Sequence, residues 1–193
     1  MSLQKYFTRT ILMGTIWGLV EVFLSPIIKS ITPHLFSVIM PSIAIVIILI
    51  GRYFVPYFGS TISMGIIAAF VEYMLGGMLL DGAFMAIILE AVFCELILSV
   101  VGFNLWSFVL SCITILDYSV LHPLIKKGVS CQSMQHIFVK NLLHTLFIVD
   151  KSVLTAVDIT FILLAFHTII GMFLGFLFYF LFQKISITEK EFA

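Results

Sequence analysis

Residues 14–25 read GTIWGLVEVFLS, an apolar stretch with two glycines and a single acid, Glu21. Glu21 is the only charged residue between Arg9 and Lys29. The rest of the chain is similar, since 62% of its 193 residues are hydrophobic and 10% are charged. Soluble domains carry about 25% charged residues. We therefore predict that this stretch belongs to a helix in lipid, and that residues 1–193 form one all-α integral membrane domain.

Six segments of the chain are apolar over nearly the length of a transmembrane helix, about 20 residues. They cover residues 10–29, 34–50, 59–80, 83–102, 104–125 and 153–183. Glycines next to charged residues separate them, as at Gly51-Arg52 and Asp81-Gly82. Residues 129–150 mix apolar and polar side chains, which is typical of a helix on the membrane surface. The predicted fold is a six-transmembrane-helix bundle with an amphipathic surface helix between helices 5 and 6.

The charges flanking these segments give little information on orientation. Five Lys and Arg residues lie on the side of the termini and five on the other side. Lys5 and Arg9 precede the first segment and favour a cytoplasmic N-terminus, because the first helix usually dominates. The basic residues at 126–151 argue against it. We expect a multi-pass protein of the cell membrane with both termini in the cytoplasm.

Ionisable residues inside the apolar segments are the main functional signal, because a charge at the bilayer centre costs roughly 2.5–3.5 kcal/mol. They are Glu21, Glu72, Glu90, Glu95, Asp117 and Asp158, with His122 and His167. No Lys or Arg is expected deep enough in a span to pair with these acids. One interpretation is a polar cavity, open to the outside, that binds protons or a neutral or cationic organic solute. The alternative is that each acid is protonated and hydrogen-bonds to a neighbouring helix.

The glycines of the opening stretch share a helix face with its acid. Gly14, Gly18, Glu21 and Ser25 follow one another at offsets of four, three and four residues. Small residues on such a face let another helix approach closely. GIIAAFVEYMLG (65–76) repeats the pattern 51 residues later, with Glu72 in the place of Glu21. This match indicates either a duplicated helix pair, a common feature of transporters, or chance similarity among apolar residues.

Sequence motifs of enzymes are missing from the chain. It has no HExxH, GxSxG or Walker sequence. Its five histidines are scattered, and its basic residues form no cluster for nucleic acid. We therefore predict a protein that is not an enzyme and that has no catalytic residues, no cofactor and no metal site.

A chain of this length with six spans, cytoplasmic termini and small residues on its first helix resembles the substrate-binding S component of energy-coupling factor (ECF) transporters. The resemblance implies capture of a vitamin-like micronutrient at the outer side. It also implies docking onto a transmembrane coupling subunit that carries two ATPase subunits. Gly14 and Gly18 match the family's small-residue docking face, and we add Glu21 to this predicted face. The subgroup that binds nickel or cobalt has a histidine after the initiating methionine, whereas this chain begins Met1-Ser2-Leu3.

The predicted binding site combines acids of three spans with nearby aromatic residues. Its members are Glu72, Glu90, Asp117, Tyr73, Trp106 and Tyr118. The expected ligand is neutral or cationic, because no basic residue is predicted inside the membrane to meet an anion. Two other functions stay open at this stage. One is a secondary transporter coupled to protonation of Glu21 and Glu72, and the other is a membrane assembly subunit without a ligand.

Overall fold

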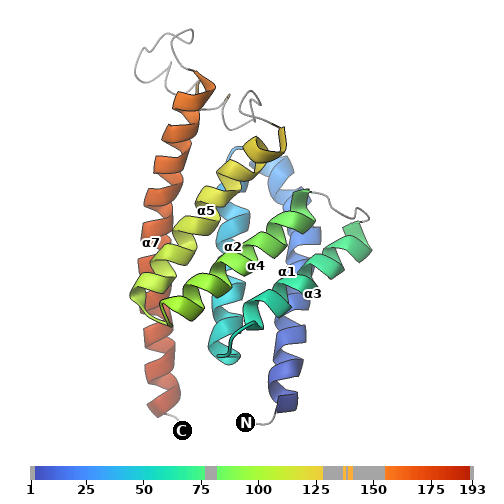
Figure 1. Ribbon diagram of the computed structural model, residues 1–193, viewed down its shortest axis with the longest axis vertical. Helices are drawn as coiled ribbons and strands as arrows, with labels where there is room; N and C mark the ends of the chain where they lie inside the picture. The colour runs from blue at the N-terminus through green and yellow to red at the C-terminus, as the bar shows by residue number, and fades with distance from the viewer. Residues whose placement is uncertain (1–2, 77–81, 128–136, 138, 141–154, 192–193) are drawn as a thin grey trace.

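The computed structural model describes residues 3–76, 82–127, 137, 139–140 and 155–191, and this part of the chain forms long helices (Figure 1). Their bounds are α1 Leu3–Ile31, α2 Phe36–Phe54, α3 Ser60–Gly76, α4 Gly82–Val100, α5 Leu105–Lys127 and α7 Ala156–Glu191. The predicted all-α fold is therefore confirmed for the described residues. The predicted surface helix at 129–150 lies almost entirely outside them.

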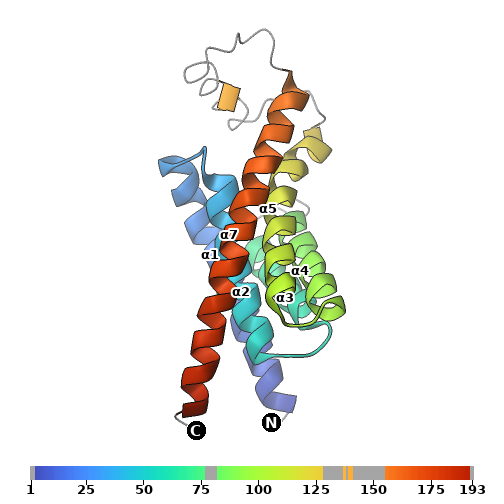
Figure 2. The same ribbon diagram turned by 90° about the vertical axis from the view of Figure 1, so that its left-hand side faces the viewer.

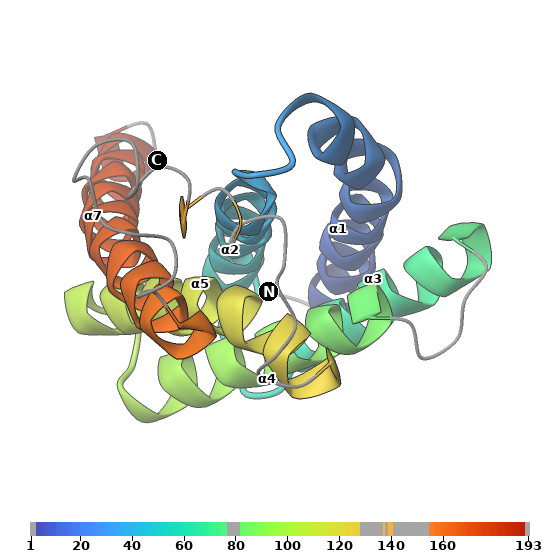
Figure 3. The same cartoon turned by 90° about the horizontal axis from the view of Figure 1, so that it is seen from above.

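The helices form two layers. Helices α1, α2 and α7 stand in one row, and α3, α4 and α5 cover it as a second row (Figures 2 and 3). α5 packs along α7, α1 packs along α3, and α2 contacts helices of both layers. α3 and α4 are steeply tilted against α1, and both termini lie at the same end of the bundle (Figure 1). We call this end the terminal end.

Five of the described helices are long and apolar enough to cross a membrane: α1, α2, α4, α5 and α7. The chain is thus a multi-pass membrane protein by the length and composition of its helices. α3 is shorter, with 17 residues from Ser60 to Gly76. The predicted third span continued to residue 80, and residues 77–80 lie outside the described part of the chain.

Three predicted span limits differ clearly from the helices: the start of α1, the end of α2, and the end of α7, which continues to Glu191 beyond the predicted end at residue 183. α1 begins at Leu3, about two turns before the predicted start at residue 10. The helix also continues through Pro26 to Ile31. α2 continues through Gly51 and Arg52 to Phe54, although we predicted that its span ends at residue 50. Gly51 and Arg52 are buried. The Arg52 side chain is paired inside the protein, as described below, so its charge does not require the helix to end.

The centre of the bundle is an apolar core shared by both layers. Its largest fully buried side chains include Trp17, Ile45, Ile48 and Phe108. The opposite faces of the outer helices carry exposed large hydrophobic residues, such as Phe23 at 63% exposed and Phe173 at 67%. A bundle with apolar residues on both its inside and its outside is suited to lipid as its solvent.

Candidate functional site

Glu21 on α1 and Glu72 on α3 lie at the same level of the bundle. Gly18 packs against Ala68 and Val71, which follow it in the sequence by 50 and 53 positions. α1 and α3 run in the same direction (Figure 1). Glu72 follows Glu21 by 51 positions, an offset between the 50 and 53 positions that separate Gly18 from the residues it packs against. The contact at Gly18 therefore brings Glu72 to the level of Glu21. The similarity between 14–25 and 65–76 therefore relates two segments that pack against each other.

Glu90 of α4 joins these two acids. Glu21 interacts electrostatically with Glu72, and Glu90 interacts electrostatically with Glu21. The Glu90 side chain is 6% exposed. We call Glu21, Glu72 and Glu90 the acid cluster. Among the described residues, no three His, Cys, Asp or Glu side chains are arranged to hold a metal ion.

Groups that could hold a polar ligand surround the acid cluster. The indole N–H of Trp17 lies near Glu21, and Lys29 at the end of α1 interacts with the same carboxyl. Tyr118 of α5 interacts electrostatically with Glu90. The Tyr118 hydroxyl is buried and makes no hydrogen bond within the described part of the chain. The cluster thus offers three carboxyls, an indole donor and a phenol hydroxyl that can donate or accept.

Asp117 belongs to a different polar group. Its carboxylate accepts a hydrogen bond from the Thr168 hydroxyl of α7, at 3.0 Å to Oδ2. The neighbouring His167 is 1% exposed and lies 2.9 Å from the Ser37 hydroxyl of α2 through its Nε2. His167 Nδ1 lies 2.8 Å from the carbonyl oxygen of Leu163, so it must carry a proton and donate. Asp117 therefore helps to join α5 to α7, and we no longer group it with Glu72 and Glu90.

The predicted aromatic residues also separate. Tyr118 lies at the acid cluster, and its ring packs edge-on against Phe93 at 5.6 Å between centroids. Tyr73 is half-buried on α3, next to Glu72 in the sequence. Trp106 is 64% exposed. It lies in the first turn of α5, about 18 Å along the helix from Tyr118. Trp106 does not line the same site, and its position is typical of an aromatic residue at a membrane interface.

The glycine face of α1 is covered by another helix of the same chain. A β-carbon on Gly14 would lie 2.7 Å from the carbonyl oxygen of Met64, and one on Gly18 equally close to that of Ala68. Both glycines are buried. The predicted close approach of a second helix is therefore observed, but the helix is α3. In this arrangement Gly14 and Gly18 are not available to a docking partner.

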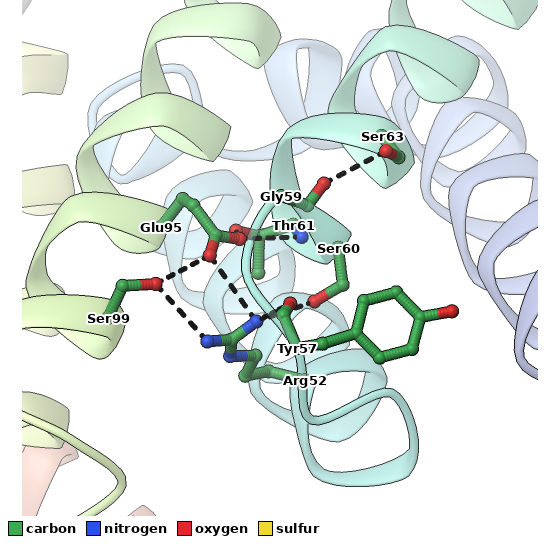
Figure 4. Close-up of polar contacts among 8 residues, drawn as sticks. All are labelled: Arg52, Tyr57, Gly59, Ser60, Thr61, Ser63, Glu95 and Ser99. Carbon is green, nitrogen blue, oxygen red and sulfur yellow. Dashed lines mark hydrogen bonds and ion pairs between the residues drawn. The ribbon is translucent and has the colours of Figure 1, made fainter.

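A second polar centre lies at the terminal end, around Arg52 and Glu95 (Figure 4). Arg52 Nη1 lies 3.3 Å from Glu95 Oε1, and the two side chains are 10% and 0% exposed. Our expectation that no basic residue pairs with the acids was wrong. Glu95 lies one and a half turns beyond Glu90 on α4, which brings it to the end of α2 instead of the acid cluster.

Neighbouring hydroxyl and backbone groups complete this ion pair. Ser99 donates to Glu95 Oε1 at 2.6 Å, and the Thr61 N–H donates to Oε2 at 2.9 Å. The Thr61 hydroxyl also donates to Oε2. Arg52 donates to the Ser60 and Ser99 hydroxyls at 2.9 and 3.2 Å, and to the Tyr57 carbonyl. These contacts tie α2 and α4 to the first turn of α3, a role in stability that the sequence analysis missed.

Comparison with known proteins gives no match. No protein-family model, curated protein or solved structure matches this chain.

The last predicted intramembrane acid, Asp158, is an exposed capping residue. Its Oδ2 accepts hydrogen bonds from the Thr155 hydroxyl at 2.6 Å and from the Thr155 N–H at 3.0 Å. In return the Asp158 N–H donates to Thr155 Oγ1 at 3.3 Å. α7 begins at Ala156, so these contacts form a capping box at its first turn. Asp158 therefore lies apart from the acid cluster.

We predict that Thr155→Val lowers the free energy of unfolding by about 1 kcal/mol, the usual cost of losing an N-cap hydroxyl. Thermal unfolding of the detergent-purified protein measures the change. Thr155→Ser keeps the hydroxyl and serves as the control, with little expected change. Equal unfolding midpoints for Thr155→Val and the unaltered protein would show that the capping box does not stabilise α7.

Proposed function

We propose that this chain is a membrane transport protein that binds a small neutral or cationic solute at the acid cluster. The observation that carries the proposal is that Glu21 of α1 interacts electrostatically with acids of two other helices, Glu72 and Glu90, within an apolar bundle. Acids in such a place are costly and are usually retained for binding or proton transfer. Protonated carboxyls donate hydrogen bonds, and ionised ones attract a cation, so the same three groups suit both kinds of solute.

The proposal includes a sixth span and a surface helix. α3 is about 25 Å long at 17 residues, and the apolar sequence GMLL (77–80) that follows it would supply the remaining length of a span. The amphipathic pattern of 129–150 supports a surface helix between the fifth and sixth spans. The even number of spans fits the placement of both termini at one end of the bundle (Figure 1).

For the energy source we propose a partner module, following the resemblance to the S component of ECF transporters. The chain would deliver a vitamin-like solute to a transmembrane coupling subunit with two ATPase subunits. Because α3 covers Gly14 and Gly18, such a subunit would have to bind another surface of the chain. One observation favours the second candidate, a proton-coupled secondary transporter. Glu21 and Glu72 interact electrostatically, so protonation of one carboxyl changes the electrostatic field at the other.

Two experiments separate these candidates. Purification from the native membrane, with assay for ATP hydrolysis, tests for the partner module. Reconstitution of the purified chain alone into liposomes, with a pH-sensitive dye inside, tests for proton-coupled transport. Proton movement driven by the solute, abolished by a protonophore, would favour the secondary transporter. A chain that moves no solute by itself but co-purifies with an ATPase would favour the partner module.

We predict that Glu72→Gln and Glu90→Gln each weaken retention of the co-purifying solute about tenfold or more, the equivalent of one lost charge-assisted contact. Native mass spectrometry of the purified protein measures retention. Asp158→Asn makes the same carboxylate-to-amide change at the exposed cap and should retain the solute. For Glu21→Gln we expect a larger loss of transport than of retention. Unchanged retention in both Glu72→Gln and Glu90→Gln would refute the acid cluster as the binding site.

A further inference from the structure

A second site lies at the terminal end, next to the Arg52–Glu95 ion pair. A pocket of about 530 Å³ opens there, a volume within the range of small-molecule sites. Its lining is mainly apolar and aromatic and includes the polar side chains of Arg52 and Ser99. The lining residues are Arg52, Tyr53, Pro56, Phe58, Leu98, Ser99, Gly102 and Phe103. These residues come from the ends of α2 and α4 and from the two turns beside them, far from the acid cluster.

Arg52 presents an unused donor edge at this pocket. Its described hydrogen bonds go from Nη1 to Tyr57, Ser60 and Glu95, and from Nη2 to Ser99. A guanidinium has five N–H groups, and Nε–H and one Nη2–H form a parallel pair along its side. Nε makes no hydrogen bond within the described part of the chain, and Nη2 has a second N–H besides the one that it donates to Ser99, which lies on the Glu95 side of the guanidinium (Figure 4). In Figure 4 this side of the guanidinium points away from the loop that carries Tyr57 and Ser60.

The geometry of a parallel N–H pair selects the ligand. Two oxygens of a phosphate fit it as a bidentate acceptor, which is stronger and more specific than a single contact. Arg52 is already paired with Glu95, but a second basic residue lies beside the end of α2, where Arg9 Nη1 donates to the Phe54 carbonyl at 3.4 Å. Its positive charge adds to the attraction for an anion near this end of α2. The aromatic wall provides an apolar surface for the remainder of an amphiphile.

We propose that this pocket binds a phosphate-bearing ligand, with two phosphate oxygens on Nε and Nη2 of Arg52 and the apolar part against Phe58 and Phe103. The pocket lies where α2 and α4 end. If these helices span the bilayer as their length and composition indicate, the headgroup region would begin near their ends. A phospholipid headgroup and a free phosphate share the chemistry that Arg52 recognises. The phospholipid also uses the aromatic wall. This site is independent of the acid cluster and of the transported solute.

The test is native mass spectrometry of the full chain in detergent, with added phosphatidylglycerol or with diacylglycerol, which has the same acyl chains and no phosphate. The unaltered protein should retain phosphatidylglycerol in preference to diacylglycerol. Arg52→Lys keeps a positive charge for Glu95 but lacks the parallel N–H pair, so the preference should fall about tenfold. Phe58 is 74% exposed, so Phe58→Ala should fold normally, and it should retain less phosphatidylglycerol. Arg9→Lys is the matched control, at the same end of the bundle but outside the pocket, and should keep the preference.

A third probe identifies the source of the phosphate. Displacement of phosphatidylglycerol by millimolar inorganic phosphate would support the pocket and assign it to a soluble phosphate. Retention in the presence of inorganic phosphate, lost in Arg52→Lys, would support it as a lipid site. Equal retention of the two lipids by the unaltered protein would overturn the proposal. So would an Arg52→Lys or Phe58→Ala protein that retains phosphatidylglycerol as well as the unaltered protein does.

Discussion

Replacing Glu95 by alanine is expected to destabilise the protein by about 3–5 kcal/mol, the cost of removing one partner of a buried ion pair. The guanidinium of Arg52 would stay in place, 10% exposed, without a counter-charge. The Thr61 N–H and the hydroxyls of Thr61 and Ser99 would lose their acceptor at the same time. Because these groups join α2, α3 and α4, the loss should affect the bundle as a whole.

A series of variants separates the charge from the hydrogen bonds. Glu95→Gln keeps an acceptor oxygen and should cost less than Glu95→Ala. The double variant Arg52→Met with Glu95→Leu removes both charges and should recover most of the lost stability, because a buried pair contributes little beyond an apolar replacement of similar volume. Denaturation in detergent, followed by tryptophan fluorescence, gives the free energies of unfolding. A Glu95→Ala protein within 1 kcal/mol of the unaltered protein would show that Arg52 can reach solvent or another partner.

The positions of the helices could be predicted because they depend on local properties of the sequence. About 20 apolar residues are enough to identify a span, and all six predicted segments contain a described helix. The close approach at Gly14 and Gly18 could also be predicted, since two missing side chains on one face leave space for a backbone. What local spacing could not give was the identity of the approaching helix, which is α3 of the same chain.

The pairing of Arg52 with Glu95 could not be derived in the same way. Arg52 lies at the end of an apolar segment, where a basic residue is usually an anchor at the membrane surface. Its partner is 43 positions later in the sequence, and the two meet only because α4 runs back to the terminal end. A usable signal was present, since Ser60, Thr61 and Ser99 bring three hydroxyls to the same end of the bundle. Hydroxyl groups there indicate a buried charge that needs hydrogen bonds.

The candidate site could be anticipated only in part, for a similar reason. Spacing and depth led us to predict Glu72 and Glu90 as binding residues, whereas we assigned Glu21 to the docking face because it shares a helix face with Gly14 and Gly18. Asp117 has a comparable depth, but its side chain reaches Thr168 of α7. The direction in which a side chain leaves its helix depends on how the helices are rotated against each other. That rotation is set by tertiary packing. The spacing of acids within a single segment gives no information about it.

The second large effect is a loss of about 1–3 kcal/mol for Gly175→Ala through overpacking, because a β-carbon there would meet backbone atoms of another helix. On an open helix surface the same change would stabilise by about 1 kcal/mol, since alanine is the better helix former. Here an added β-carbon would lie 2.5 Å from the Cα and 2.9 Å from the backbone nitrogen of Val109. Backbone atoms cannot rotate away as a side chain can, so α5 and α7 would have to separate.

The sign of the change therefore decides whether packing or helix propensity dominates at Gly175. Gly171 makes the same kind of contact one turn earlier, with its β-carbon position 2.8 Å from the Cα of Ile113. Gly171→Ala should thus destabilise as well, and the double variant should cost less than the sum, because one separation of α5 from α7 relieves both contacts. Met172→Ala, at a site 44% exposed on the outer face of α7, is the control and should change stability little. If thermal unfolding in detergent showed Gly175→Ala to be more stable than the unaltered protein, α7 would have to pack less closely on α5 than it does here.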